Sequence, residues 1–183
     1  MKTLVVVTGA SCSGKTTLAQ ALGLELSLPA LHRDVLKEAL FDTLGSYDRE
    51  WSRTLGGVSY ELLFSVLETL LRAGCSCVIE SNFEAGRHGD RLRGLCDRYG
   101  FVPVEILLTA DLETLRDRYK ARLSSRHVGH VDHANESTNE AAWTGERHGT
   151  LTLGGRTICL DTARFGELEQ TALIDELKTS LAR

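Results

Sequence analysis

Residues 9–16, with the sequence GASCSGKT, place two glycines, a lysine and a hydroxyl side chain at a fixed spacing. Glycines at such positions let the backbone wrap closely around an anion, so that successive N–H groups point at phosphate oxygens. The lysine can reach the β- and γ-phosphates of a nucleoside triphosphate, and the threonine hydroxyl can ligate Mg²⁺. The pattern predicts a phosphate-binding loop formed by Gly9, Ser11, Cys12, Ser13, Gly14, Lys15, Thr16 and Thr17.

The residues on either side of this loop are those of a strand and a helix. Residues 4–8 are a continuous apolar and β-branched run, typical of a strand buried on both faces. After the loop, Leu18, Ala19, Leu22 and Leu26 recur at helical spacing. The alternative, a glycine-rich turn with an exposed lysine, is disfavoured because motif and context agree. The N-terminus of the following helix adds a favourable partial charge.

Asp34 follows a short predicted strand at residues 28–32, on the side of an open α/β sheet where ligands bind. A carboxylate there can accept the proton of an attacking hydroxyl that lies in line with the γ-phosphate. Asp34 also suits the N-cap of the next helix, and the two roles are compatible. Lys37 lies one turn later and faces the same way. It either holds an anionic part of an acceptor or is solvated surface.

Glu80 ends a predicted strand at residues 77–80. A carboxylate at the tip of a strand beside a phosphate loop can hold Mg²⁺, usually through water, although aspartate is commoner at this position. Asn82 binds either acceptor or backbone, and Arg87 meets either phosphate or solvent. The predicted metal ligands are Thr16 and Glu80, and the predicted substrate residues are Arg33, Lys37, Asn82 and Arg87.

Arg118, Arg122 and Arg126 are four residues apart and are expected to follow one helix face. Like charges stacked in this way repel one another unless an anion lies opposite. The functional interpretation is that they close over the triphosphate and stabilise charge in the transition state, with Arg122 and Arg126 as catalytic residues beside Lys15 and Asp34. The alternative is a solvated stripe of charge.

Three histidines, His127, His130 and His133, invite a zinc interpretation. Their spacing does not present three ligands on one side of a helix, and no cysteine lies near to complete a site. We therefore expect polar residues that meet substrate or water.

The elements that must position these residues alternate between strands and helices. The strongest helix signal covers residues 51–73, where apolar side chains keep the spacing of one buried stripe: Leu55, Val58, Leu62, Leu63, Val66, Leu67, Leu70 and Leu71. Gly74 follows where a C-terminal cap belongs. Further strands are expected at residues 104–108 and 157–160. This order predicts βαβ units and a parallel sheet covered on both faces. Residues 124–149 lack periodicity and are expected to form a lid.

Length and composition set further bounds. A chain of 183 residues suits a single domain, residues 1–183, with a real core. A net charge of −4 disfavours general nucleic-acid binding. No apolar run approaches the roughly 20 residues that span a bilayer, so no membrane segment is expected. The five cysteines are scattered and are expected to be reduced, which predicts a cytoplasmic protein.

In these motifs the chain resembles the small P-loop kinases of the nucleoside-monophosphate-kinase-like group. It is most similar to those related to polynucleotide kinase, chloramphenicol phosphotransferase and the zeta-toxin kinases. The resemblance covers the phosphate loop, residues 32–34 with Lys37, residues 80–83, and residues 126–130, which resemble a lid signature. It implies a three-layer fold with a five-stranded parallel sheet in the order 2-3-1-4-5. It also implies that Asp34 is the general base, that Arg118 and Thr162 lie near the adenine, and that Arg122 and Arg126 reach the phosphates.

The leading hypothesis is an ATP- and Mg²⁺-dependent kinase acting on a hydroxyl of a small molecule such as a nucleoside, sugar or antibiotic. A 5′-hydroxyl polynucleotide kinase is an alternative suggested by Arg87, Arg91 and Arg93, although the acidic balance of the chain weighs against it. A GTPase-like switch is less favoured, because the DxxG at residues 42–45 lies in a helical stretch and no NKxD segment selects guanine. A nucleotide binder without catalysis is opposed by the intact Lys15, Thr16 and Asp34. The oligomeric state and the acceptor are left open.

Overall fold

The computed structural model describes residues 1–130, 143 and 149–181. Five parallel strands form its sheet: β1 (Thr3–Gly9), β2 (Ala30–His32), β3 (Cys77–Glu80), β4 (Val102–Thr109) and β5 (Arg156–Asp161). Their order is β2-β3-β1-β4-β5, as the resemblance implied. The carboxyl ends of the central strands therefore lie together at one edge, where ligands bind in sheets of this kind.

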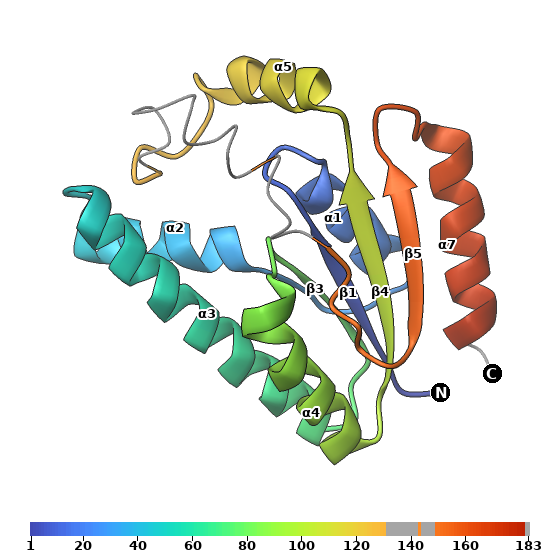
Figure 1. Ribbon diagram of the computed structural model, residues 1–183. Coiled ribbons are helices and arrows are strands. Elements are labelled where there is room, and N and C mark those ends of the chain that lie inside the picture. Colours follow the sequence, from blue (N-terminus) through green and yellow to red (C-terminus); the bar gives the residue numbers. More distant parts are fainter. Residues whose placement is uncertain (131–142, 144–148, 182–183) are drawn as a thin grey trace.

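Helices cover both faces of the sheet and give three layers (Figure 1). One face packs against α3 (Arg49–Arg72) and α4 (Asp90–Tyr99), through a core that includes Leu4, Val6 and Ile79. The other face packs against α1 (Lys15–Glu25) and α7 (Glu167–Leu181), with Val5 and Val7 at its centre. Alternate residues of β1 thus enter opposite cores, which explains why the whole strand is apolar.

Three further elements lie around the carboxyl edge of the sheet. Helix α2 (Arg33–Leu44) follows β2 directly, α5 (Leu112–Arg122) follows β4, and a π-helical turn, η1 (Ala85–Gly89), follows β3. The N-cap of α2 is His32, so the expectation that Asp34 caps this helix is wrong. Asp34 lies instead within the first turn.

Helix α3 confirms the strongest helix prediction but corrects its buried stripe. Leu55, Leu63, Leu67 and Leu71 are buried in the core, whereas Val58, Leu62 and Val66 are each 40% exposed. Its ends follow capping rules, because Asp48 accepts the Trp51 N–H at 2.8 Å and Gly74 adopts a left-handed φ of 76°. Among the described segments α3 is the one helix long and apolar enough to span a bilayer, and 33% of its apolar window is buried within the protein.

The structure also corrects the expected helix that carries three arginines. Helix α5 ends at Arg122, with Leu123 as its C-cap, so Arg126 lies beyond it and does not share its face. The expected lid, residues 124–149, falls mostly outside the described residues, as do His133 and residues 131–142. Its described start, residues 127–130, lies against α2, where His127 contacts Asp42 and His130 contacts Glu38.

Candidate active site

The loop between β1 and α1 has the backbone conformations that its sequence predicts. A Cβ atom on Gly9 would lie 2.2 Å from the Leu108 carbonyl oxygen, so a side chain does not fit there. Gly14 adopts a left-handed φ of 89°, and Cys12 also has a positive φ, 67°. Glycine tolerates such angles without strain, and a non-glycine residue rarely adopts them outside functional loops. These angles give residues 9–14 the shape of a tight cradle beside the N-terminus of α1.

Lys15, the first residue of α1, is buried, and its Nζ donates to the Ala10 carbonyl at 2.8 Å across the loop. Burial lowers the pKa of Lys15, whereas the nearby carboxylates of Glu80 and Asp34 raise it in part. The ammonium therefore lies within the loop, where a phosphate group would meet it.

Thr16 and Glu80 form the candidate metal site. The Thr16 hydroxyl donates to Glu80 Oε2 at 3.2 Å, and His32 Nδ1 lies 3.4 Å from the same oxygen. Glu80 is buried at the tip of β3, 4% exposed, because β3 lies next to β1 in the sheet. A hydroxyl and a carboxylate oxygen are the ligands that Mg²⁺ prefers, with phosphates and water completing its shell. These residues therefore fit the metal.

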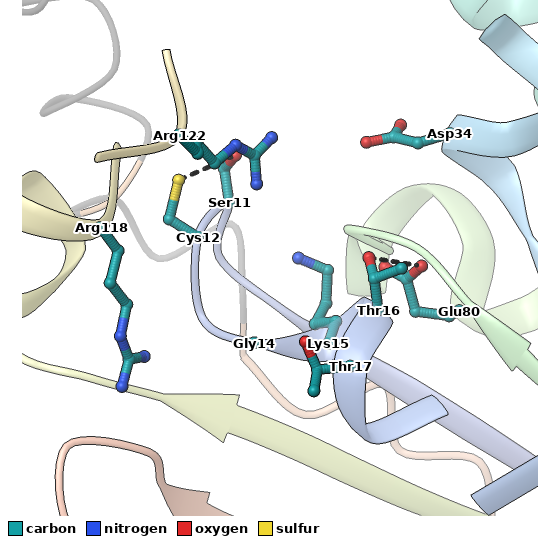
Figure 2. A pocket seen from close by; sticks show the side chains of 10 residues that line it. All are labelled: Ser11, Cys12, Gly14, Lys15, Thr16, Thr17, Asp34, Glu80, Arg118 and Arg122. Atoms are coloured by element: carbon teal, nitrogen blue, oxygen red, sulfur yellow. Dashed lines mark hydrogen bonds between the residues drawn. The ribbon is translucent and has the colours of Figure 1, made fainter. Parts of the chain in front are cut away.

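Asp34 faces the loop from the start of α2, across the pocket from Lys15 (Figure 2). Arg33 Nη2 donates to Asp34 Oδ1 at 2.5 Å. Burial would raise the pKa of Asp34, but Arg33, His130 and Lys15 outweigh it and lower the pKa below the ordinary value of 3.8. Asp34 is therefore an ionised carboxylate at neutral pH.

Two side chains that the sequence did not single out for a role beside Asp34 hold Arg33 in place. The Arg33 guanidinium lies 4.9 Å from the centre of the Tyr60 ring, and the His88 ring stacks on Tyr60 at 4.4 Å. The Tyr60 hydroxyl donates to Asn82 at 3.1 Å and accepts from Ser81 at 3.0 Å. A tyrosine at helical spacing on α3 is usual in a core, so no local signal marks this function.

Arg118 and Thr162, which the resemblance places near the adenine, contact each other. Arg118 Nη1 donates to the Thr162 hydroxyl at 2.9 Å and Nη2 to the Thr162 carbonyl at 2.7 Å. These contacts fix the guanidinium beside the loop, and Arg122 lies one turn further along α5.

These side chains line one pocket of about 160 Å³. Its lining residues are Ser11, Cys12, Gly14, Lys15, Thr16, Thr17, Asp34, Glu80, Arg118 and Arg122.

Some of the predicted site residues do not line this pocket. Arg126 is one of them, and the catalytic role assigned to it remains a prediction. Arg87 is exposed on η1, and Asn82 contacts Tyr60. Lys37 is buried, only 9% exposed, so the interpretation as solvated surface is wrong.

The sheet order, the loop after the central strand and the carboxylates opposite it define a small P-loop protein of the kinase type. A family model described as an AAA domain matches residues 4–143. The chain belongs to this family.

Solved structures agree with this class. A candidate kinase from Chloroflexus aurantiacus j-10-fl is 33% identical, with a TM-score of 0.88 over 97% of each chain. Kti12 from Chaetomium thermophilum, in complex with ADP-AlF3, is 18% identical, with a TM-score of 0.65 over 95% of this chain and 96% of its own. A gluconokinase from Sinorhizobium meliloti 1021 is 16% identical, with a TM-score of 0.61 over 98% and 95%. The last two show the fold alone. The comparison with curated proteins gives no match.

Proposed function

We propose that this protein transfers the γ-phosphoryl group of Mg-ATP to a hydroxyl of a small-molecule acceptor. The observation that carries the proposal is the position of Asp34. Its ionised carboxylate shares one pocket with Lys15 and the phosphate loop, so an acceptor hydroxyl can lie between the base and the γ-phosphate.

Each residue of the pocket has a part in this reaction. The loop N–H groups and Lys15 bind the β- and γ-phosphates, while Arg118 and Thr162 border the base of the nucleotide. Thr16 and Glu80 would hold Mg²⁺, and the metal would neutralise part of the phosphate charge. Arg122 faces the same pocket and stabilises the charge that develops on the transferred group.

The proton of the acceptor hydroxyl moves to Asp34. Arg33 occupies Oδ1, and no described residue hydrogen-bonds to Oδ2, which is left for the acceptor. As the hydroxyl oxygen forms its bond to the γ-phosphorus, the bond from that phosphorus to the bridging oxygen breaks, and ADP leaves. Asp34 needs only to accept the proton late in this step, so an ionised carboxylate of low pKa suffices.

The alternative of a polynucleotide acceptor has lost part of its motivation. Arg91 donates twice to Glu61, at 2.8 and 3.0 Å, and Arg93 donates to Asp90 and to the Thr152 carbonyl. Two of the three arginines that suggested it are thus paired within the protein.

A cytoplasmic location is proposed on the cysteines. All five thiols are free, and those of Cys75 and Cys159 are exposed, which suits a reducing compartment.

The test is a transfer screen with γ-labelled ATP, Mg²⁺ and panels of nucleosides, sugars, sugar acids, antibiotics and hydroxyl-ended oligonucleotides. We expect label on one class of small molecule, and none with Lys15→Ala. Asp34→Asn should lower kcat by about 10²- to 10⁴-fold while ATP binding is retained. Transfer that survives Asp34→Asn with little loss would refute this mechanism.

A further inference from the structure

Helices α2 and α3 face each other beside Asp34 through two matching rows of side chains. On α2 the row is Arg33 and Lys37, and on α3 it is Tyr60, Gly56 and Ser52, each four residues from the next. Arg33 lies over the Tyr60 ring, and Lys37 Nζ donates to Ser52 Oγ at 3.0 Å. Two cations thus lie between the two helices, on the same helix as Asp34.

Both cations are taken out of water. Lys37 is 9% exposed and the Arg33 side chain 13%. Arg33 Nε is moreover buried and makes no hydrogen bond with any described residue, although its Nη2 binds Asp34. A buried N–H donor on a charged group that lacks an acceptor is costly, and an anionic oxygen removes that cost best.

Gly56 leaves space at this place. Among the side chains of the described residues, a Cβ atom on Gly56 would have Lys37 alone within 4 Å, with Nζ at 3.7 Å and Cε at 3.9 Å. A glycine inside a helix costs about 1 kcal/mol relative to alanine, and no backbone contact requires one here. A longer side chain at this position would occupy the space next to the Lys37 ammonium. Gly57, its neighbour, is exposed, and no atom of another described element lies within 4 Å of its Cβ position.

We propose that the acceptor carries an anionic group, a carboxylate or a phosphate, which lies between α2 and α3 against Lys37 and Arg33. From there the acceptor presents its hydroxyl to Asp34, one helical turn away. This inference rests on the proposed function and names the class of its acceptor. Neutral and cationic alcohols lack the anionic group that these two cations would bind.

The two glycines give a matched test. Calorimetric titration in saturating Mg-ADP, which occupies the phosphate loop, would use gluconate, glycerate, glycerol phosphate and inorganic phosphate as anionic probes. Glucose, glycerol and glucosamine are the neutral and cationic controls. Anionic probes should bind the wild type and weaken about 10- to 100-fold in Lys37→Gln, the effect of losing one charge-assisted hydrogen bond. Gly56→Leu should lose the same binding, whereas Gly57→Leu, with the same change on the open side of the helix, should keep it.

Neutral probes that bind as tightly as anionic ones, no binding of any anion, or anion binding that survives Gly56→Leu would each overturn the inference. Should Gly56→Leu fail to fold, Lys37→Gln and Gly56→Ala, whose Cβ makes only ordinary contacts, carry the test. The label-transfer screen separates the two proposals. Label on neutral alcohols would leave a kinase and refute the anionic acceptor, while anion binding without transfer to any acceptor would refute the kinase and leave the binding site.

Discussion

Arg33 sets the charge of the residue that follows it. Its guanidinium binds the Asp34 carboxylate and rests on the Tyr60 ring; the Arg33 side chain is 13% exposed and that of Asp34 43%. Burial alone would raise the pKa of Asp34, and Arg33 is the largest of the charges that lower it. Arg33 is therefore the main one of three neighbours, with His130 and Lys15, that lower the pKa of Asp34.

Arg33→Gln should consequently move the acidic limb of the kcat–pH profile to higher pH. Without the guanidinium the largest of the charges that lower the pKa of Asp34 is lost, so that pKa rises and the base is protonated earlier as pH falls. The measurement is kcat against pH at saturating acceptor. Arg98→Gln, at an exposed arginine that pairs with Glu68 near the C-terminal end of α3, is the control and should leave the limb in place. An unshifted limb in Arg33→Gln would show that Asp34 is not the titrating base.

At the scale of residues, the sequence predicted which side chains lie together wherever a motif fixes the spacing of those residues. Lys15, Thr16, Asp34 and Glu80 do meet in one pocket, because each lies at or next to the carboxyl end of a strand. The part that Tyr60 and His88 play beside Arg33 was not predicted, because Tyr60 meets Arg33 only through the packing of α3 against α2 and His88 stacks on Tyr60 from η1. Arg126 was grouped with Arg118 and Arg122 by a helical spacing that ends four residues earlier, at Arg122.

At the scale of elements, the segment of residues 127–130 is attached to α2. The Phe41 ring stacks on His127 at 5.8 Å and meets the edge of His130 at 5.9 Å. His127 and His130 contact Asp42 and Glu38 at 3.0 Å each. A Cβ atom on Gly129 would lie 2.2 Å from the Phe41 ring. The segment therefore reaches α2 closely only because residue 129 has no side chain.

Gly129→Ala should destabilise the fold by about 1–3 kcal/mol, because the added methyl overlaps the Phe41 ring. Phe41→Ala should cost about 3–5 kcal/mol by itself, since the ring is buried. In the double variant the Gly129→Ala penalty should vanish. Chemical denaturation of the four proteins measures this cycle, and additive losses would contradict the contact.

The elements themselves were largely predictable, and the errors have physical causes. The strand expected at residues 28–32 is confirmed only at Ala30–His32, because its apolar start does not show which residues pair with β3. The stripe of α3 was drawn too wide, because a helix beside one sheet face buries only one side. A strand buried on both faces, such as β1, is recognisable from its composition alone.

At the scale of the whole molecule, Glu105 is a buried ionisable residue inside the sheet, where apolar residues are usual. It lies in the middle of β4, 1% exposed, and accepts the Leu151 N–H at 2.6 Å and the Thr157 hydroxyl at 3.4 Å. Leu151 and Leu153 enter the same core as α3 and α4. The carboxylate thus ties residues 151–153 to the sheet, while its burial raises the pKa of Glu105 more than these hydrogen bonds lower it.

When folding raises the pKa of a carboxyl group, the free energy of unfolding decreases as pH rises. The folded state holds the proton more tightly than the unfolded chain, so stability falls from the ordinary value of 4.5 up to the raised pKa and is then constant. Glu105→Gln, which mimics the protonated form, should be more stable at neutral pH by on the order of 1 kcal/mol, or about 2–4 °C in Tm. The gain should disappear below pH 4.5.

Thermal unfolding of both proteins across this range tests the prediction. Asp97→Asn, an exposed acid on α4, removes the same charge and should show no such gain. A Glu105→Gln protein that is less stable at neutral pH would mean that the ionised carboxylate stabilises the fold.

Strand β1 comes first in the chain but occupies the middle of the sheet, where Leu4 pairs with Cys77 on one side and Pro103 on the other. As the nascent chain leaves the ribosome, its apolar residues have no neighbouring strand until β3 and then β4 have been synthesised. Closing such long loops costs entropy before any contact repays it, which slows folding. The phosphate loop at the end of β1 therefore gains its final shape late, and until then the strand is a target for chaperones or aggregation.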